Sequence, residues 1–209
     1  MQLKWWRWLP LVCAVPAAPQ SVQFPAHETF YYTIEWRLIT AGRAALRWTA
    51  PAQTGGPWQA SLHLESVGLV SKLFHVDDDY HVNLSQAFCA QSSQMSSQEG
   101  RREHETHIVF DSATHKATYV ERDRVKNTVF LAQQTDIPAC VHDIIGGLFF
   151  LRTLNLEPQQ SAEVPMSDGK KSVMARVEAQ AREEIKTPAG TFKTIRYEAY
   201  LFNNVLYSR

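Results

Sequence analysis

The stretch IPACVHDIIGGLFFLR, residues 137–152, carries a helical pattern in a chain whose other segments alternate between apolar and polar residues, as β-strands do. Its apolar side chains recur at the spacing of one helical face, which predicts a helix over about 138–152 with one buried stripe. The predicted stripe consists of Val141, Ile144, Ile145, Leu148 and Phe149.

Four other residues of this stretch bear on how the helix begins and packs. Pro138 lies just before it, and Asp143 lies in its first turn, where a carboxylate is stabilised by the helix dipole. Gly146 and Gly147 each cost about 1 kcal/mol relative to alanine in a helix interior. We therefore expect a neighbouring strand to approach the helix closely at these glycines.

Alternating residues predict strands on both sides of the helix. The first, from Glu28 to Thr40, places Phe30 and Trp36 on one face, and Asp168-Gly169 favours a tight hairpin turn near the end of the chain. Further strands are predicted over 43–49, 58–66, 76–84, 103–110, 116–123, 125–131, 162–166, 171–180, 183–187 and 191–202, with a weaker one between 86 and 100. Roughly 10–11 strands and one helix predict a mainly β fold, either a curved antiparallel sheet or a half-open β-barrel wrapped around the helix.

Composition narrows the class of protein. The chain has 209 residues, of which 44% are hydrophobic and 20% charged, and its 21 basic side chains equal its 21 acidic ones. A chain without net charge has no overall field to attract nucleic acid, so we expect no nucleic-acid partner. No apolar run is long enough for a transmembrane span.

The N-terminal residues have the composition of an export signal. Lys4 and Arg7 precede a short apolar segment, Trp8–Ala14, and Val15-Pro16-Ala17 offers small residues for cleavage. We predict a signal peptide over residues 1–18, a single β-rich domain over 19–209, and a periplasmic or otherwise exported protein.

Two cysteines, Cys89 and Cys140, remain once the leader with Cys13 is removed. An even pair in an exported chain favours a disulfide between them. Two buried free thiols are the alternative, because free cysteine is often buried without a function.

Three segments carry a resemblance to a known family: FYYTIEWRLITAGRAALRW (30–48), PACVHDIIGGLFFLR (138–152) and KTPAGTFKTIRYEAYLFNN (186–204). Over about 24–209 the chain resembles the bacterial exported domain-of-unknown-function family three thousand one hundred and eight. The resemblance implies a periplasmic or envelope protein with a curved antiparallel sheet, distantly similar to half-barrel lipoprotein carriers. Family members continue past the equivalent of Asn204 into another hairpin, so we expect this chain to be incomplete at its C-terminus.

Candidate catalytic and metal residues are few. His142 and Asp143 could form a general base, but neighbouring helix residues point about 100 degrees apart, and helix capping is the simpler role. Within Asp77-Asp78-Asp79 only the two outer carboxylates share a strand face, too few for calcium without another ligand. His104 and His107 fall on opposite faces of a strand. We expect no catalytic residue, no metal site and no cofactor.

The predicted function is a non-enzymatic binding or scaffolding module of the cell envelope. We expect its ligand to be apolar or lipid-like, namely a lipid, a lipoprotein or a cell-wall component, bound on the aromatic side chains Trp36, Trp48, Trp58 and Phe149. The same aromatics could instead simply fill the core. The competing function, a hydrolase acting on envelope polymers, requires His142, Asp143 or Asp77 to gather in one pocket.

Overall fold

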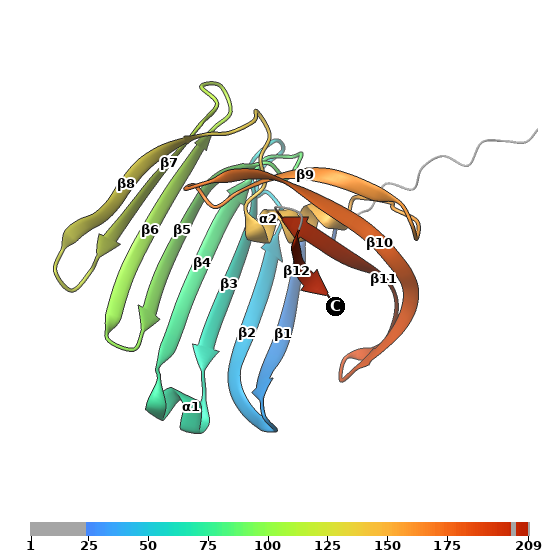
Figure 1. The fold of residues 1–209 in the computed structure, drawn as a ribbon, viewed down its shortest axis with the longest axis horizontal. Helices are drawn as coiled ribbons and strands as arrows, with labels where there is room; N and C mark the ends of the chain where they lie inside the picture. The colour runs from blue at the N-terminus through green and yellow to red at the C-terminus, as the bar shows by residue number, and fades with distance from the viewer. Residues whose placement is uncertain (1–23, 202–203, 209) are drawn as a thin grey trace, which may run out of the picture.

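The larger of two antiparallel sheets has eight strands, each beside its neighbours in the sequence (Figure 1). The computed structural model describes residues 24–201 and 204–208, so the predicted signal peptide, 1–18, lies outside the described residues. The strands of this sheet are β1 (His27–Trp36), β2 (Ile39–Thr49), β3 (Trp58–Ser66), β4 (Val76–Leu84), β5 (Ala90–Glu99), β6 (Arg102–Asp111), β7 (Lys116–Asp123) and β8 (Thr128–Asp136). A short helix, α1 (Gly68–Leu73), connects β3 to β4.

The smaller sheet has the strand order β12-β11-β10-β9. Its strands are β9 (Ser161–Ser167), β10 (Ser172–Thr187), β11 (Gly190–Leu201) and β12 (Asn204–Ser208). The helix α2 (Ile144–Leu151) contacts β3 and β4 of the large sheet and β9 of the small one (Figure 1). The predicted mainly β fold with a curved antiparallel sheet is confirmed.

The strand boundaries differ from the prediction in several places. The strand predicted over 28–40 is divided, because Arg37 and Leu38 form the turn between β1 and β2, with positive φ angles of 47° and 70°. β10 is one strand from Ser172 to Thr187, where the sequence predicts two, because a bulge between Ala179 and Ala181 lets the pairing with β11 continue past the break in alternation. β8 begins at Thr128 rather than at Val125, because residues 124–127 form the turn after β7.

Helix α2 begins later than predicted, at Ile144 rather than near Pro138. The carboxylate of Asp143 caps it by accepting hydrogen bonds from the backbone N–H groups of Ile145, at 3.2 Å, and Gly146, at 2.9 Å. Val141 cannot belong to the helix, because its carbonyl accepts a hydrogen bond from the backbone N–H of Ala90 at the start of β5. The capping role predicted for Asp143 is confirmed.

The close approach predicted at the two glycines of α2 is also confirmed. A Cβ atom at Gly146 would lie 2.6 Å from the side chain of Leu84 on β4, and one at Gly147 would lie 2.9 Å from the side chain of Met166 on β9. Helix α2 therefore packs closely against both sheets at its two glycines, where no side chain separates the backbone from the strands.

A disulfide between Cys89 and Cys140 joins the β4–β5 connection to the segment that leads into α2, with the two Cα atoms 5.1 Å apart. The predicted disulfide is confirmed. Beneath it lies the hydrophobic core, in which Trp48, Leu84, Val141 and Phe149 are each at most 2% exposed.

Candidate functional site

Helix α2 has apolar side chains on two faces, not on the single buried stripe that the sequence predicts. Ile145 and Phe149 are buried in the core, whereas Ile144 is 65% and Leu148 is 49% exposed. Only one side of the helix packs against the core, because Gly146 and Gly147 bring that side close to the two sheets. The predicted burial of Ile144 and Leu148 is therefore wrong, and the helix offers an uncovered apolar face.

Leu148 and Leu151 on this face line a groove of about 810 Å³ between α2 and the β10–β11 hairpin. The apolar lining is completed by Leu154, Leu156, Phe192, Ile195 and Tyr197, and the polar lining comes from Arg152, Asn155, Glu157, Arg182, Lys193 and Thr194. The groove thus combines a leucine-rich wall with three basic side chains and one acidic side chain.

Two polar contacts fix the walls of the groove relative to each other. The hydroxyl of Tyr197 on β11 donates a hydrogen bond of 2.9 Å to the carbonyl of Leu154, in the segment that follows α2. Arg182 on β10 forms an ion pair with Glu157 in the same segment, with a nitrogen–oxygen distance of 2.6 Å. The segment after α2 is therefore tied to both strands of the hairpin.

Arg152, at the C-terminal end of α2, links the groove to the large sheet. Its guanidinium forms an ion pair with Glu28 on β1 and lies 4.8 Å from the ring centre of Phe24. A cation over an aromatic face is stabilised by the quadrupole of the ring. The positive charge of Arg152 is thus held in place beside the groove.

The structure brings together three of the four aromatic residues predicted to bind a ligand. The ring centre of Trp48 lies 4.5 Å from that of Trp58 and 4.4 Å from that of Phe149, and Trp48 and Phe149 are buried. Trp36 lies apart from them at the end of β1 and is 57% exposed. This is the packing of an aromatic core, and ligand binding by the four residues stays a prediction.

The apolar residues that line the groove are not identified as ligand-binding residues by sequence reasoning. The sequence pattern places Leu148 in the buried stripe and indicates no role for Leu151, Leu154 or Leu156. A signal was present, because leucines continue beyond the helix in LRTLNLE, residues 151–157. Nothing in the sequence, however, places these leucines opposite Phe192 on β11.

His142 and Asp143 are both buried but do not act as a pair. The Nδ1 atom of His142 donates a hydrogen bond of 2.8 Å to the carbonyl of Phe88, and burial lowers the pKa of the imidazole. Asp143 instead accepts a hydrogen bond from Tyr80, and burial raises the pKa of its carboxyl. Both side chains are occupied by structural contacts.

The other candidate residues are distributed over both faces of the large sheet. Asp78 is buried on the inner face, where its carboxylate accepts a hydrogen bond from the backbone N–H of Gln98, whereas Asp77 is exposed on the outer face. His104 pairs with Glu121 at 2.7 Å on the inner face, and His107 is exposed on the outer face. The gathering of His142, Asp143 and Asp77 that a hydrolase requires is not formed.

The fold and the groove together define a mainly β protein of two antiparallel sheets with an amphiphilic groove beside its larger helix. Comparison with family profiles then identifies it: the chain belongs to the family described as "Protein of unknown function (DUF3108)", whose profile matches residues 31–206. No helix among the residues described here is both long enough and apolar enough to cross a membrane.

Among solved structures, the chain is similar to the crystal structure of a DUF1089 family protein from Pseudomonas aeruginosa. The alignment covers 85% of this chain and 94% of the other, with a TM-score of 0.40 and 14% sequence identity. No curated protein matches the chain.

Proposed function

We propose that this protein is an exported envelope protein that binds an amphiphile with an acyl chain and an anionic head group, without catalysing a reaction. The observation that carries the proposal is the groove beside α2, where leucines and three basic side chains line the same open space of about 810 Å³. This volume lies within the range of about 300–1,000 Å³ that is typical of ligand pockets.

The apolar part of the groove supplies the driving force for binding. Leu148 and Phe192 are each 49% exposed in the free protein, so a hydrocarbon chain that covers them removes apolar surface from water. Each methylene group buried in this way contributes about 0.8 kcal/mol. A chain of several methylene groups is enough to give measurable affinity.

The charged part of the groove favours an anionic head group. Among the described residues, Lys193 is the basic lining residue that forms no ion pair, and the guanidinium groups of Arg152 and Arg182, now paired with Glu28 and Glu157, can exchange these partners for an anionic ligand. Guanidinium groups bind carboxylate and phosphate oxygens through two parallel hydrogen bonds. The groove can therefore hold the charged end of a fatty acid or phospholipid near the end of α2.

Export is part of the proposal and rests on two observations. The N-terminal sequence has the composition of a signal peptide, and the disulfide between Cys89 and Cys140 is typical of an oxidising compartment. Secretion in a suitable bacterium should give a mature N-terminus at Ala18 or Pro19. Intact Met1 in the cytosol as the dominant form would contradict export.

Titration of the purified protein with a fluorescent fatty acid tests the binding. Leu148→Asp and Phe192→Asp each place a carboxylate in the groove and should lower the affinity at least about tenfold, a change of 1.4 kcal/mol. Leu73→Asp on α1 and Phe130→Asp on β8 are matched controls, because both residues are well exposed elsewhere, at 78% and 67%. Equal affinities in all four variants, or no probe binding at all, would contradict the proposal.

A further inference from the structure

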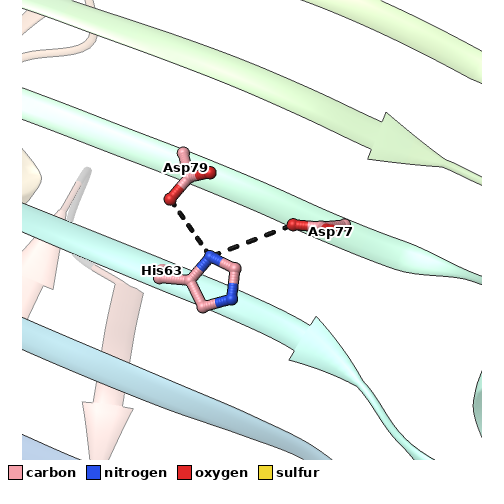
Figure 2. Close-up of side chains that lie close together, drawn as sticks. All are labelled: His63, Asp77 and Asp79. Carbon is pink, nitrogen blue, oxygen red and sulfur yellow. Dashed lines mark hydrogen bonds and ion pairs between the residues drawn. The ribbon is translucent and has the colours of Figure 1, made fainter.

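His63, Asp77 and Asp79 converge on the outer face of the large sheet, away from the groove and the core. His63 belongs to β3, and the two aspartates belong to β4 (Figure 2). Their neighbours Leu62 and Tyr80 pack against the core, so alternation along the strands directs the three side chains to the opposite face. No residue of the amphiphilic groove takes part in this cluster.

Strand pairing brings the three residues together. His63 and Asp79 are direct partners in the antiparallel register of β3 and β4, and Asp77 is two residues away on the same face of β4. Both strands lie inside the large sheet, with β2 paired to β3 and β5 paired to β4. The backbone that carries the cluster is therefore held by hydrogen bonds on both sides.

The distances fit ligands of one small cation. The Nδ1 atom of His63 lies 3.1 Å from Oδ1 of Asp79 and 3.9 Å from Oδ1 of Asp77. All three potential ligand atoms lie within 4.8 Å of one another. Ligand atoms at 2.0–2.2 Å from a tetrahedral zinc ion are about 3.3 Å apart, so small rotations of the side chains are sufficient to surround an ion.

We propose that His63, Asp77 and Asp79 form a binding site for a divalent transition-metal ion of the zinc type. One imidazole nitrogen and two carboxylate oxygens are ligands that zinc accepts, and three protein ligands leave a coordination position for water. Calcium requires six to eight oxygen ligands, more than this site provides. The imidazole supplied by β3 favours a transition-metal ion over calcium and magnesium, which prefer oxygen ligands.

The charges around the cluster support a cation between the carboxylates. Among the residues that the structure describes, no lysine or arginine forms an ion pair with Asp77 or Asp79. Glu65 is the register partner of Asp77, which adds a third carboxylate on this face. Two basic residues lie near the cluster without pairing with its aspartates. Arg43 is the register partner of Glu65, and Arg124 donates a hydrogen bond to Ser96, which is the register partner of Asp79.

The alternative reading is an ordinary exposed ion pair between His63 and Asp79. Their side chains are 40% and 51% exposed, and such pairs contribute little to stability because solvent screens them. An ion pair alone does not predict zinc binding, whereas the proposed site does. Zinc affinity therefore distinguishes the two readings.

Isothermal titration of the full chain with zinc chloride, after removal of bound metal with a chelator, tests the site. We expect one equivalent of zinc to bind through this cluster. His63→Ala and Asp79→Asn should each lower the affinity at least about tenfold. Loss of a residue that only hydrogen-bonds to a metal ligand already costs about 10–100-fold, and these two residues are proposed to bind the ion directly. His27→Ala is the matched control, because His27 is an exposed histidine at the start of β1, two strands away from β3, and its loss should leave the affinity unchanged.

The absence of zinc binding would overturn the proposal, as would zinc binding that His63→Ala leaves unchanged. Circular dichroism checks that each variant is folded, and Asp77→Asn provides a further test on a different exposed side chain. Calcium or magnesium at the same concentration should not displace zinc, and displacement by either would also contradict the site. The titration contains no amphiphile, so its result is independent of the groove.

Discussion

The hydroxyl of Tyr80 donates a hydrogen bond of 2.7 Å to Oδ2 of Asp143, which joins the inner face of β4 to the cap of α2. The two residues are 63 positions apart in the sequence, and Asp143 is only 1% exposed. The carboxylate of Asp143 thus accepts hydrogen bonds both from the first N–H groups of α2 and from a side chain of the large sheet. The position of α2 relative to this sheet therefore depends on Asp143.

Removal of this hydroxyl should destabilise the protein. Tyr80→Phe leaves the buried carboxylate of Asp143 without one of its donors, which costs about 1–3 kcal/mol. Tyr31→Phe is the control, because Tyr31 is 77% exposed on β1. The measurement is the free energy of unfolding in urea, and equal values for the two variants would show that the hydrogen bond contributes nothing.

The two glycines of α2 should respond differently to alanine. At Gly146 a Cβ atom would lie 2.6 Å from both Asp143 and Leu84, so Gly146→Ala should lower the stability by about 1–3 kcal/mol despite the better helix propensity of alanine. At Gly147 the nearest atom, 2.9 Å away, is the flexible end of Met166, so Gly147→Ala should be near neutral. Thermal unfolding of both variants decides the point, and the reverse order would contradict the packing described here.

Stability should fall on mild acidification because of His142. Burial lowers the pKa of its imidazole in the folded state, whereas the unfolded chain takes up a proton near the ordinary value of 6.5. Below that pH the unfolded state binds more protons than the folded state, and the stability decreases by up to about 1.4 kcal/mol per pH unit. The loss continues until the pH reaches the lowered pKa of the folded protein.

His142→Asn tests this linkage, because its amide can still donate to the carbonyl of Phe88. The variant should show a flatter dependence of unfolding free energy on pH between about 7.5 and 5. Asp143, whose pKa is raised by burial, titrates in both proteins and does not affect the difference between them. If the two proteins showed the same dependence of unfolding free energy on pH, His142 would bind as many protons in the folded state as in the unfolded state, which would contradict the lowered pKa.

Reduction of the disulfide should lower the stability substantially. The bond between Cys89 and Cys140 closes a loop with a sequence separation of 51 residues, for which the loss of chain entropy in the unfolded state contributes about 4 kcal/mol. The double variant Cys89→Ser and Cys140→Ser should match the reduced protein in its melting temperature. Alkylation of both residues in the unreduced, secreted protein would contradict the bond.

The sequence predicts the fold well where one residue pattern determines one local structure. Alternation predicts most of the strands, Asp168-Gly169 predicts the turn between β9 and β10, and Gly146 with Gly147 predicts the close approach to α2. The predicted start of α2 is wrong, because helical spacing at Val141 cannot reveal that its carbonyl accepts a hydrogen bond from Ala90. Pairing between distant segments outweighs the local pattern there.

The candidate sites are harder to predict from the sequence than the strands, because they too depend on pairing between distant segments. The groove requires Leu148 and Phe192 to face each other across α2 and β11, and the metal cluster requires His63 to be the register partner of Asp79. Both relationships depend on which strands pair and in which register, and a single sequence does not contain that information.

The order of strands in the large sheet also determines how the chain can fold. Each of its strands pairs with the strand next to it in the sequence, so the sheet can grow one hairpin at a time from contacts that close short loops. Helix α2 contacts the following strand β9, but its docking on the large sheet also requires distant contacts, because Asp143 at its cap accepts a hydrogen bond from Tyr80, 63 residues earlier in the chain. We therefore expect sheet growth to be fast and the docking of α2 to be the slow, rate-determining step of folding.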